Sequence, residues 1–373
     1  MKALSGTLVV SLDQAVAAPM TARRLADAGA RVIKLERPEG DFARDYDRAV
    51  AGQSTHFLWL NRGKESVVID LRQSDDRRLF EALLAKADVF LANLKPGALA
   101  KLGYGIEELR QRHPRLICCA ISGYGDEGPF RERKAYDLLV QAESGLASLT
   151  GGPEAPARVG VSVVDIGTGL YAYEAILEAL IRRSRTGEGA VIKVSMFDCM
   201  MEWMTVPLLF AEWAQAPQRS GLSHPSLAPY GVFVSADGVP ILISIQNDRE
   251  WAVLCHKVLA RPELASDPRF ATGPARLAHR AETDAAVAEC FGALEVVALS
   301  QKLAAAEIAF ARVNQMADVL KHPHLRRVKV ATPAGPVLLP APAARADEEA
   351  MEFGAIPALG AHTEAVRREF LGR

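Results

Sequence analysis

The sequence predicts an α/β fold that combines a large α/β domain with a smaller α+β domain. Short apolar runs, typical of buried parallel strands, recur in the first half of the chain. Segments with helical periodicity separate these runs, and strands that alternate with helices form parallel sheets. After about residue 216 the pattern changes to a β-hairpin followed by Ala-rich helices, which indicates the second, smaller domain.

The first elements are those of a βαβ unit. Residues 8–12 and 31–35 are apolar enough to be buried strands. Residues 20–28 between them are predicted to be helical, because Pro19 lies where a first turn tolerates proline and Gly29 provides a stop.

The same alternation continues along the chain. Further strands are predicted at residues 66–71, 89–92, 116–121 and 190–197, and further helices at residues 75–87, 106–113 and 136–147. The glycine-rich residues 125–129 predict a surface turn or lid. Residues 161–164 are expected to be extended and 167–183 to be an amphipathic helix, with an apolar face formed by Leu170, Tyr173, Leu177, Leu180 and Ile181.

The second half begins with a linker, residues 216–225. A hairpin follows, with strands at 230–235 and 240–245 and a turn at Asp237-Gly238. Residues 248–319 are expected to be helical, and Pro and Gly within residues 328–340 are typical of short edge strands. We therefore expect one domain to contain residues 1–215 and 319–373, and the other to contain residues 226–318.

Composition and charge exclude several classes of protein. Of 373 residues 49% are hydrophobic and 24% are charged, the ordinary profile of a globular protein. The 44 basic and 45 acidic residues leave a net charge of −1, so no bulk charge favours nucleic acid or an anionic membrane as partner. No apolar run approaches the ~20 residues of a membrane span, and no signal peptide precedes the first strand. The five cysteines are scattered and odd in number, so we expect reduced thiols, no metal site and a cytoplasmic enzyme.

The opening βαβ unit has the outline of a dinucleotide-binding unit. Glu36 ends the second strand, where a ribose would be held, but the first loop, residues 13–19, contains no glycine. Its backbone N–H groups therefore cannot close on a pyrophosphate in the usual way. Two interpretations remain open: the unit binds nothing, or it holds an adenine nucleotide differently, with Arg37 or Lys34 offered to a phosphate.

A second glycine motif, G-x-G-x-x-A at residues 167–172, also matches a dinucleotide fingerprint. Asp165 lies two residues before it, where its carboxylate would repel a pyrophosphate, so NAD binding is the weaker interpretation. At a helix N-terminus the same carboxylate would be ionised at neutral pH and could act as a nucleophile. The glycines would let a thioester approach the backbone. The alternative is that Asp165 only caps the helix.

Other candidate groups are less specific. Tyr136 and Asp137 follow a glycine-rich loop and could bind substrate, although helix starts often carry such residues. None of the histidines has the spacing of a metal site, and His322-Pro323-His324 is typical of a turn. The sequence also contains neither a Walker A segment nor a G-x-S-x-G elbow.

Five segments together resemble the class III coenzyme A transferases, the superfamily of formyl-CoA transferases, carnitine CoA-transferases and α-methylacyl-CoA racemases. They are GARVIKLERP at 29–38, LNRGKES at 60–66, SGYGDEGP at 122–129, VDIGTG at 164–169 and DPRF at 267–270. The resemblance implies an interlocked homodimer whose large Rossmann-like domain is built from both ends of each chain. It also implies that Asp165 is the nucleophile.

The chemistry implied by the resemblance needs an acyl-CoA donor and a carboxylic acid acceptor, with no metal or redox cofactor. Asp165 would form an anhydride with the acyl group and then a thioester with CoA. The resemblance places CoA against residues from several loops, and Lys134 and Tyr136 nearer the reacting end, with Asp137 also expected to bind substrate or CoA. The expected CoA contacts are Gln14, Ala15, Val16, Arg37, Leu71, Arg72, Asn93, Leu94 and Lys101.

Departures from the family pattern guide the choice of substrate. Residues 224–231, HPSLAPYG, stand where oxalate-using formyl-CoA transferases have a glycine-rich lid, and Val16 replaces their loop glutamine. The likeness is greatest to transferases for C4–C5 dicarboxylates such as mesaconate, citramalate, itaconate and succinate, and CoA transfer within one acid is an option. Tyr136 stands where the racemases have a histidine, and a phenol is a poor base at pH 7. Racemisation and a non-catalytic CoA-binding dimer are the alternatives.

Overall fold

The computed structural model describes residues 2–344 and 352–372, which form two compact units. Unit 1 contains residues 1–147, 158–208 and 326–373, so it combines the first half of the chain with its C-terminal segment. Unit 2 contains residues 148–157 and 209–325. Within the described ranges, no helix has the length and apolarity that crossing a membrane would require.

Unit 1 is built on a six-stranded parallel sheet with the order β3-β2-β1-β4-β5-β6. The order reverses between β1 and β4, and loops at the carboxyl ends of strands beside such a switch point are where α/β sheets bind ligands. In chain order the strands are β1 (Leu8–Leu12), β2 (Arg31–Glu36), β3 (Lys64–Val68), β4 (Val89–Ala92), β5 (Ile117–Ser122) and β6 (Ala190–Ser195).

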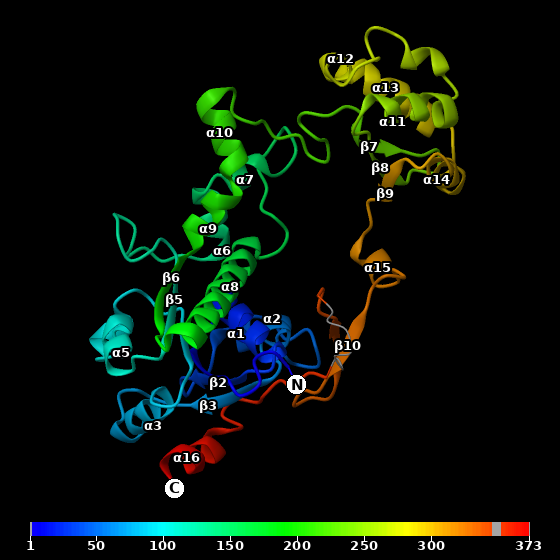
Figure 1. Ribbon diagram of the computed structural model, residues 1–373. Helices are drawn as coiled ribbons and strands as arrows, with labels where there is room; N and C mark the ends of the chain where they lie inside the picture. Colours follow the sequence, from blue (N-terminus) through cyan, green and yellow to red (C-terminus); the bar gives the residue numbers. More distant parts are fainter. Residues whose placement is uncertain (1, 345–351, 373) are drawn as a thin grey trace. The chain divides into compact units, whose positions relative to one another are not determined.

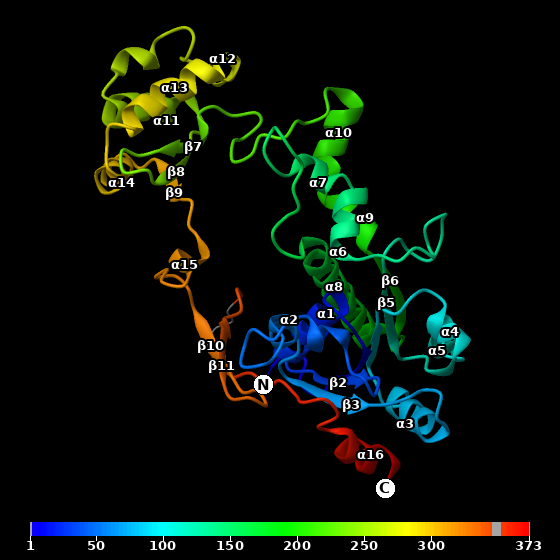
Figure 2. The same cartoon turned by 180° about the vertical axis from the view of Figure 1, so that it is seen from behind.

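Helices cover both faces of this sheet (Figures 1 and 2). On one face α1 (Ala17–Asp27) and α8 (Val163–Thr186) pack over Val9 and its neighbours. On the other face α3 (Ser74–Leu84), α5 (Ile106–Arg112) and the C-terminal α16 (Thr363–Leu371) pack over Val10. Adjacent residues of one strand thus enter different cores, which explains why these strands read as continuous apolar runs.

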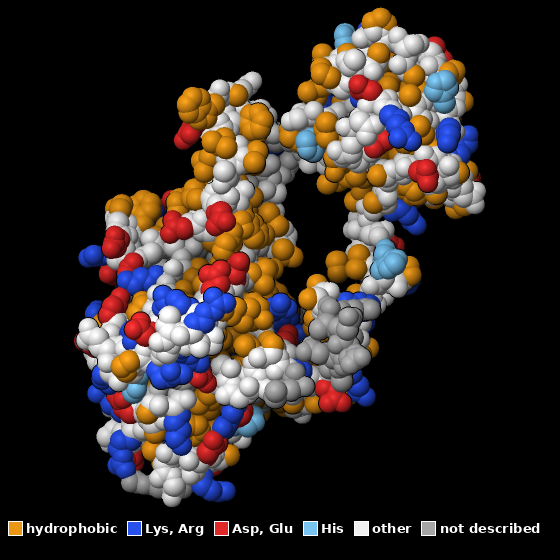
Figure 3. Space-filling model, in the orientation of Figure 1, with side chains coloured by type: hydrophobic (Ala, Val, Ile, Leu, Met, Phe, Trp, Pro, Cys, Tyr) orange, Lys and Arg blue, Asp and Glu red, His pale blue; other side chains and the backbone are white. Residues whose placement is uncertain are grey.

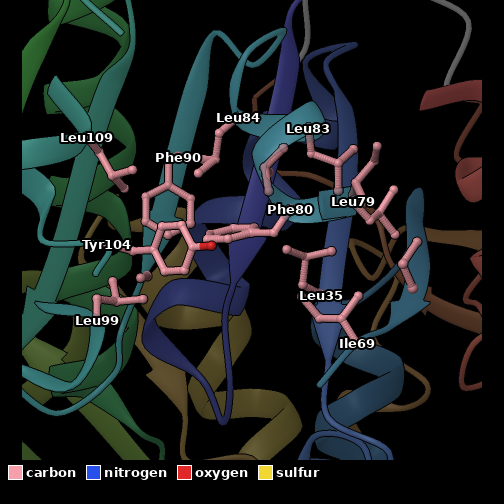
Figure 4. Close-up of a cluster of buried hydrophobic side chains, with 14 of the residues drawn as sticks. Leu35, Ile69, Leu79, Phe80, Leu83, Leu84, Phe90, Leu99, Tyr104 and Leu109 are labelled. Atoms are coloured by element: carbon pink, nitrogen blue, oxygen red, sulfur yellow. The ribbon is translucent and has the colours of Figure 1, made fainter. Parts of the chain in front are cut away.

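The second of these cores is shown in Figure 4. Phe80 of α3 makes edge contacts with Phe90 of β4, at a ring-centroid distance of 5.7 Å, and with Tyr104, at 4.8 Å. Val366 of α16 is buried in the same cluster, so a residue near the C-terminus completes a core begun by the first strand.

The predicted strands and helices of unit 1 are confirmed, with three differences in position. Strand β3 begins at Lys64, before the predicted residues 66–71. The polar side chains of Lys64 and Ser66 are buried and hydrogen-bonded, and an apolar pattern does not reveal such strand positions. The helix expected at 136–147 is divided into α6 (Asp137–Glu143) and α7 (Leu146–Leu149) at Gly145, which has a φ of 81°.

The third difference concerns α8. Residues 163 and 164 are helical rather than extended, so Asp165 is the third residue of the helix and not its N-cap. The predicted apolar face is correct only in part: Tyr173 and Leu180 pack against the core, whereas Leu170 and Ile181 are exposed, because the most closely packed face is made largely of small residues. The buried residues of α8 are Val164, Gly167, Thr168, Gly169, Ala172, Ile176 and Ala179.

Unit 2 contains the predicted hairpin, as β7 (Tyr230–Val234) paired antiparallel with β8 (Pro240–Ser244). A third strand, β9 (Ala309–Arg312), pairs with β8 inside the region where only helical segments were expected. Its tertiary pairing, not its local sequence, makes it a strand. Trp251 and Phe291 lie in the core of this unit. The helices are α11 (Asp248–Val253), the π-helix η2 (Leu254–Leu259), the 3-10 helix η3 (Pro262–Ala265), α12 (Gly273–Ala278), α13 (Arg280–Phe291), α14 (Val296–Ala305) and α15 (Met316–Val319).

The remaining elements include the predicted edge strands of the tail, which pair antiparallel as β10 (Arg327–Val330) and β11 (Val337–Pro340). Apolar side chains lie exposed on α10 (Thr205–Trp213), as the orange atoms over this helix show in Figure 3. Trp213 is 84% exposed. The other short helices are η1 (Phe42–Asp45), α2 (Thr55–Leu60), α4 (Ala98–Lys101), α9 (Met196–Trp203) and α10 (Thr205–Trp213).

Candidate functional site

A cavity of about 460 Å³ in unit 1 contains Asp165. We call it the Asp165 cavity. It lies at the carboxyl ends of β1, β4 and β5, beside the start of α8, and so at the switch point of the sheet. Lys134 and Tyr136, expected near the reacting end, line it together with Asp165 and Asp137. Five of the expected CoA contacts also line it: Gln14, Ala15, Val16, Asn93 and Leu94.

A second cavity, of about 480 Å³, lies at the carboxyl ends of β1, β2 and β3. We call it the Arg37 cavity. It is lined by Arg37, Leu71 and Arg72, and it shares Gln14 and Leu94 with the Asp165 cavity. Lys101 lines neither of these two cavities; its side chain is exposed on α4.

The loop after β1 joins the two cavities and is held by side chains. Asn93 binds Gln14 twice, accepting from its N–H at 3.0 Å and donating to its carbonyl at 2.8 Å. The N–H of Ala15 donates to Asp41 Oδ1 at 3.1 Å, and Ala15 has the left-handed φ of 62° that usually favours glycine. These two N–H groups already have partners, which agrees with the prediction that this loop cannot cradle a pyrophosphate.

Beneath this loop lies a buried charge network. Lys34 Nζ binds Asp13 Oδ1 at 3.1 Å and Asp41 Oδ2 at 2.9 Å, and Lys64 Nζ binds Asp13 Oδ2 at 2.7 Å. All four side chains are essentially inaccessible to solvent. Neighbouring positive charges hold the pKa of Asp13 well below its usual range even though burial opposes this, whereas burial lowers the pKa of Lys64 to about 8.

The contacts of Lys34 in this network, and those of Glu36 beside it, correct two sequence-based expectations about nucleotide binding. Lys34 is buried and fully paired, so it is not available to a phosphate. Glu36 is bound by Arg44, at 2.7 and 2.8 Å, and by Ser66, so its carboxylate is not free for a ribose. Arg37 is exposed and has no ion-pair partner among the described residues, so it remains available.

Asp165 is fixed at the start of α8 by a second carboxylate. The first helical N–H groups lack partners within the helix, and the N-cap, Ser162, makes no side-chain cap. Asp137 supplies it: its Oδ1 accepts from the N–H of Val164 at 2.8 Å and from that of Asp165 at 3.2 Å. Its Oδ2 accepts from Gln141 Nε2 at 2.6 Å.

The electrostatic environment of Asp165 differs from the sequence-based expectation. A helix N-terminus favours an ionised carboxylate, but burial, with a smaller contribution from Asp137, raises the pKa of Asp165 to about 7. Desolvation penalises the charged form of a carboxyl group, and a nearby negative charge does the same. A fraction of the Asp165 side chains is therefore protonated near neutral pH, where an ordinary aspartate is almost fully ionised.

The glycines after Asp165 serve helix packing. A Cβ atom on Gly169 would lie 2.7 Å from the carbonyl oxygen of Ala17 and 2.8 Å from Met20 Cβ, both in α1. A Cβ on Gly167 would lie 3.0 Å from Trp203. Both glycines are buried within the helix, so the expectation that they leave the backbone open to a thioester is wrong.

Several residues that line the Asp165 cavity were not singled out from the sequence. Phe42, Tyr46 and His56 form an aromatic wall, with ring-centroid distances of 5.7 Å for the first pair and 5.2 Å for the second. Burial raises the pKa of Tyr46 to about 12, with smaller effects from Asp41, Asp165 and Tyr136. Lys95 and Arg158 also line the cavity. No motif marks these residues, which come from separate loops and short helices.

The five cysteines are free thiols, and all but Cys290, which is partly exposed, are buried. Among residues 2–344 and 352–372, no group of three or more His, Cys, Asp or Glu side chains is placed to hold a metal ion. Burial raises the pKa of Cys119 to about 12.

Comparison with known proteins identifies the family. Residues 4–363 match the CoA-transferase family III. This chain belongs to that family. It is therefore a CoA-transferase, an enzyme that moves CoA between carboxylic acids, and the resemblance noted in the sequence is confirmed.

Curated relatives of the transferase carry related names. An acetyl-CoA:oxalate CoA-transferase of Acetobacter aceti is 35% identical over 98% of this chain and 95% of its own length. A succinyl-CoA:glutarate CoA-transferase of Mus musculus is 34% identical over 100% of this chain and 87% of its own. A succinyl-CoA:mesaconate CoA-transferase of Haloarcula marismortui is 34% identical over 87% of this chain and 84% of its own.

Solved structures match the transferase over nearly its whole length. A CAIB/BAIF family protein from Brucella suis is 35% identical, with a TM-score of 0.85 and 99% of both chains covered. A protein of Mycobacterium tuberculosis is 30% identical, with a TM-score of 0.87 over 98% of this chain and 99% of its own. The mixed α/β fold with a parallel six-stranded sheet is thus that of this family.

Proposed function

We propose that the transferase moves CoA between C4–C5 dicarboxylic acids and that Asp165 is its nucleophile. The observation that carries this proposal is the position of the Asp165 carboxylate in a cavity at the switch point of the sheet, among the residues expected near the reacting end. Its pKa of about 7 leaves a substantial ionised fraction at neutral pH and makes that fraction more basic than an exposed aspartate.

The proposed reaction passes through two anhydrides and one thioester. A carboxylate oxygen of Asp165 attacks the thioester carbon of the donor; the carbon–sulfur bond breaks and CoA leaves as a thiolate. The thiolate attacks the Asp165 carbonyl carbon and releases the donor acid. The acceptor carboxylate then attacks the carbonyl carbon of the Asp165–CoA thioester; the carbon–sulfur bond breaks, CoA leaves as a thiolate and a second anhydride forms. The thiolate attacks the acceptor carbonyl of this anhydride, which yields the new CoA ester and releases the Asp165 carboxylate. Every bond is made by groups of Asp165, CoA and the two acids, so this sequence needs no metal or redox cofactor.

The two cavities suggest how CoA is held. They share Gln14 and Leu94, so one elongated ligand can pass from one to the other. We place the phosphates and adenosine in the Arg37 cavity, where Arg37 has no ion-pair partner in the described part of the chain and Leu71 offers apolar surface. The thioester then reaches Asp165. Lys101, outside both cavities, would contact at most the edge of the ligand.

The dicarboxylate class is supported by the names of relatives that act with succinate, glutarate and mesaconate. Residues 224–231 of unit 2, which replace the glycine-rich lid, support the same choice. Their backbone is anchored by Arg280, which donates to the carbonyls of His224 at 2.6 Å and Leu227 at 2.8 Å. Oxalate is the competing acceptor, because a relative of similar identity is named for it.

We further propose an interlocked homodimer in the cytoplasm. The exposed apolar side chains of α9 and α10, including Trp203, Phe210 and Trp213, are of the kind that a partner subunit covers. Free, mostly buried cysteines suit a reducing compartment.

The deciding experiment is a transfer assay. Purified enzyme is incubated with succinyl-CoA or acetyl-CoA and, separately, glutarate, mesaconate, itaconate, citramalate and oxalate, and new CoA esters are identified by mass spectrometry. We expect the C4–C5 acids to be better acceptors than oxalate. Oxalate as the best acceptor would contradict the substrate class. Exchange of an α-proton with deuterated solvent, without CoA transfer, would contradict the transferase reaction itself.

A further inference from the structure

We propose that Arg158 binds the distal carboxylate of a dicarboxylic substrate and thereby selects dicarboxylates over monocarboxylates. The inference rests on the proposed function, since it assumes that an acyl group reacts at Asp165. Two features of the molecule support it: the charges that line the Asp165 cavity and one chain of hydrogen bonds.

The charge balance of the cavity identifies two available cations. Four Lys and Arg side chains line the Asp165 cavity. Lys95 is paired with Glu132 at 3.0 Å and Arg133 with Glu143 at 3.1 Å. Lys134 and Arg158 have no acidic partner among residues 2–344 and 352–372.

A dicarboxylate needs such a cation. It brings an extra negative charge into a cavity already lined by Asp137 and Asp165, and like charges at short range repel strongly where water is partly excluded. A monocarboxylate of the same length carries a methyl group there instead and has no such need.

Arg158 suits this role better than Lys134 because of the chemistry of its side chain. A guanidinium binds a carboxylate through two parallel hydrogen bonds, which an ammonium group cannot do. In this structure Nε and Nη2 of Arg158 donate only to the neighbouring carbonyls of Val159 and Gly160, both at 3.2 Å. Nη1 makes no hydrogen bond to a described residue, so it is available to a substrate.

A hydrogen-bond chain fixes the loop of Arg158 relative to Asp165. The N–H of Val159 donates to Gln141 Oε1 at 2.9 Å, and Gln141 Nε2 donates to Asp137 Oδ2 at 2.6 Å. Asp137 Oδ1 accepts from the N–H of Asp165 at 3.2 Å. The Asp137 carboxylate, through Gln141, thus connects Asp165 to Val159, the residue beside Arg158. A group that selects substrates by length must be held at a set distance from the reacting atom.

The test compares paired acceptors that differ only at the distal end. Arg158→Gln removes the charge from an exposed side chain, and Arg131→Gln is the matched control, because Arg131 is exposed on a neighbouring loop and does not line the cavity. We expect Arg158→Gln to raise KM for succinate and glutarate about 10- to 100-fold. KM for butyrate and pentanoate should change less than about twofold, and Arg158→Lys should restore part of the preference.

Binding supplies a second readout. In the Asp165→Asn background, Arg158→Gln should weaken succinyl-CoA binding by a similar factor and leave butyryl-CoA binding unchanged, as measured by calorimetry. Equal losses for both acids, or a selective loss in Lys134→Gln with none in Arg158→Gln, would overturn this inference while leaving the transferase function intact. Failure of the unmodified enzyme to transfer CoA to any acid would overturn the proposed function, and this inference with it.

Discussion

The carboxylate of Asp137 accepts a hydrogen bond from the backbone N–H of Asp165, with 3.2 Å between N and Oδ1, across 28 positions of sequence. It accepts another from Val164 at 2.8 Å. Asp137 thus caps α8 from outside and adds a negative charge beside the side chain of Asp165. Burial, with a smaller contribution from this charge, raises the pKa of Asp165 to about 7.

Asp165→Asn should abolish CoA transfer and leave the fold intact. An amide cannot supply the attacking oxygen, so turnover should fall by at least about 10³-fold. Asp198→Asn is the matched control, since Asp198 is also the third residue of a helix, α9, but is exposed and outside the cavity. Wild type incubated with acyl-CoA and hydroxylamine should carry a hydroxamate on the peptide with Asp165. A mark on Asp137, or an active Asp165→Asn enzyme free of deamidation, would show that the nucleophile lies elsewhere.

Activity should rise with pH through about pH 7 as Asp165 ionises, because only the carboxylate attacks the thioester. Asp137→Asn removes a neighbouring negative charge and should move this rise to lower pH, since that charge raises the pKa of Asp165. The measurement is kcat/KM between pH 5 and 8.5. A profile that is flat through pH 7, or one that moves to higher pH in Asp137→Asn, would refute the assignment.

Asp165→Asn should also stabilise the fold at high pH. The pKa of Asp165 is raised in the folded state, so its contribution to stability is complete below the unfolded-state value near 4 and is lost as pH rises through about 7. An amide does not ionise, so the variant should exceed wild type by up to roughly 2–4 kcal/mol at pH 8 and by little at pH 4.5. Urea denaturation at both pH values measures the difference. A constant difference across pH would mean that Asp165 is not titrating as proposed.

Gly169→Ala should loosen the packing of α8 on α1. The new Cβ would meet the carbonyl oxygen of Ala17 at 2.7 Å, and backbone cannot move aside easily. We expect a loss of about 1–3 kcal/mol in the free energy of unfolding. Gly152→Ala is the control, because a Cβ there meets nothing within 4 Å. Equal stabilities of the two variants would argue against this tight helix contact.

The proposed dimer should persist at nanomolar concentration. Interlocked subunits bury far more than the ~1,600 Å² of a standard interface and cannot separate without unfolding. Light scattering and mass photometry over a dilution series should therefore show a single dimeric species. A monomer that reappears on dilution and reassociates on concentration would contradict interlocking.

Most of the sheet could be predicted from the sequence, because its strands are buried on both faces and so appear as apolar runs such as residues 89–92. Strand β3 was displaced in the prediction, since Lys64 and Ser66 are buried through charge pairing and hydrogen bonding, not through apolarity. Strand β9 was missed because its pairing with β8 is long-range. Local patterns contain no information on either effect.

Only some of the residues of the candidate site could be predicted from the sequence. The residues around the β1 loop and Asp165 were found through motifs that the family shares, and they do meet in one cavity. Tyr46, His56 and Arg158 were missed, because each comes from a segment without a motif and joins the cavity only through the folding of the chain.

The sequence by itself determined the alternation of strands and helices, the family of the enzyme and the presence of Asp165 beside a glycine motif, since these are properties of neighbouring residues. Only the tertiary structure decided that α8 begins before Asp165, that Gly167 and Gly169 pack helices, and that the pKa of Asp165 lies near 7. Each of these depends on a side chain distant in sequence. Burial and charge act through space, and spatial neighbours such as Asp137 and Asp165 are chosen by the fold.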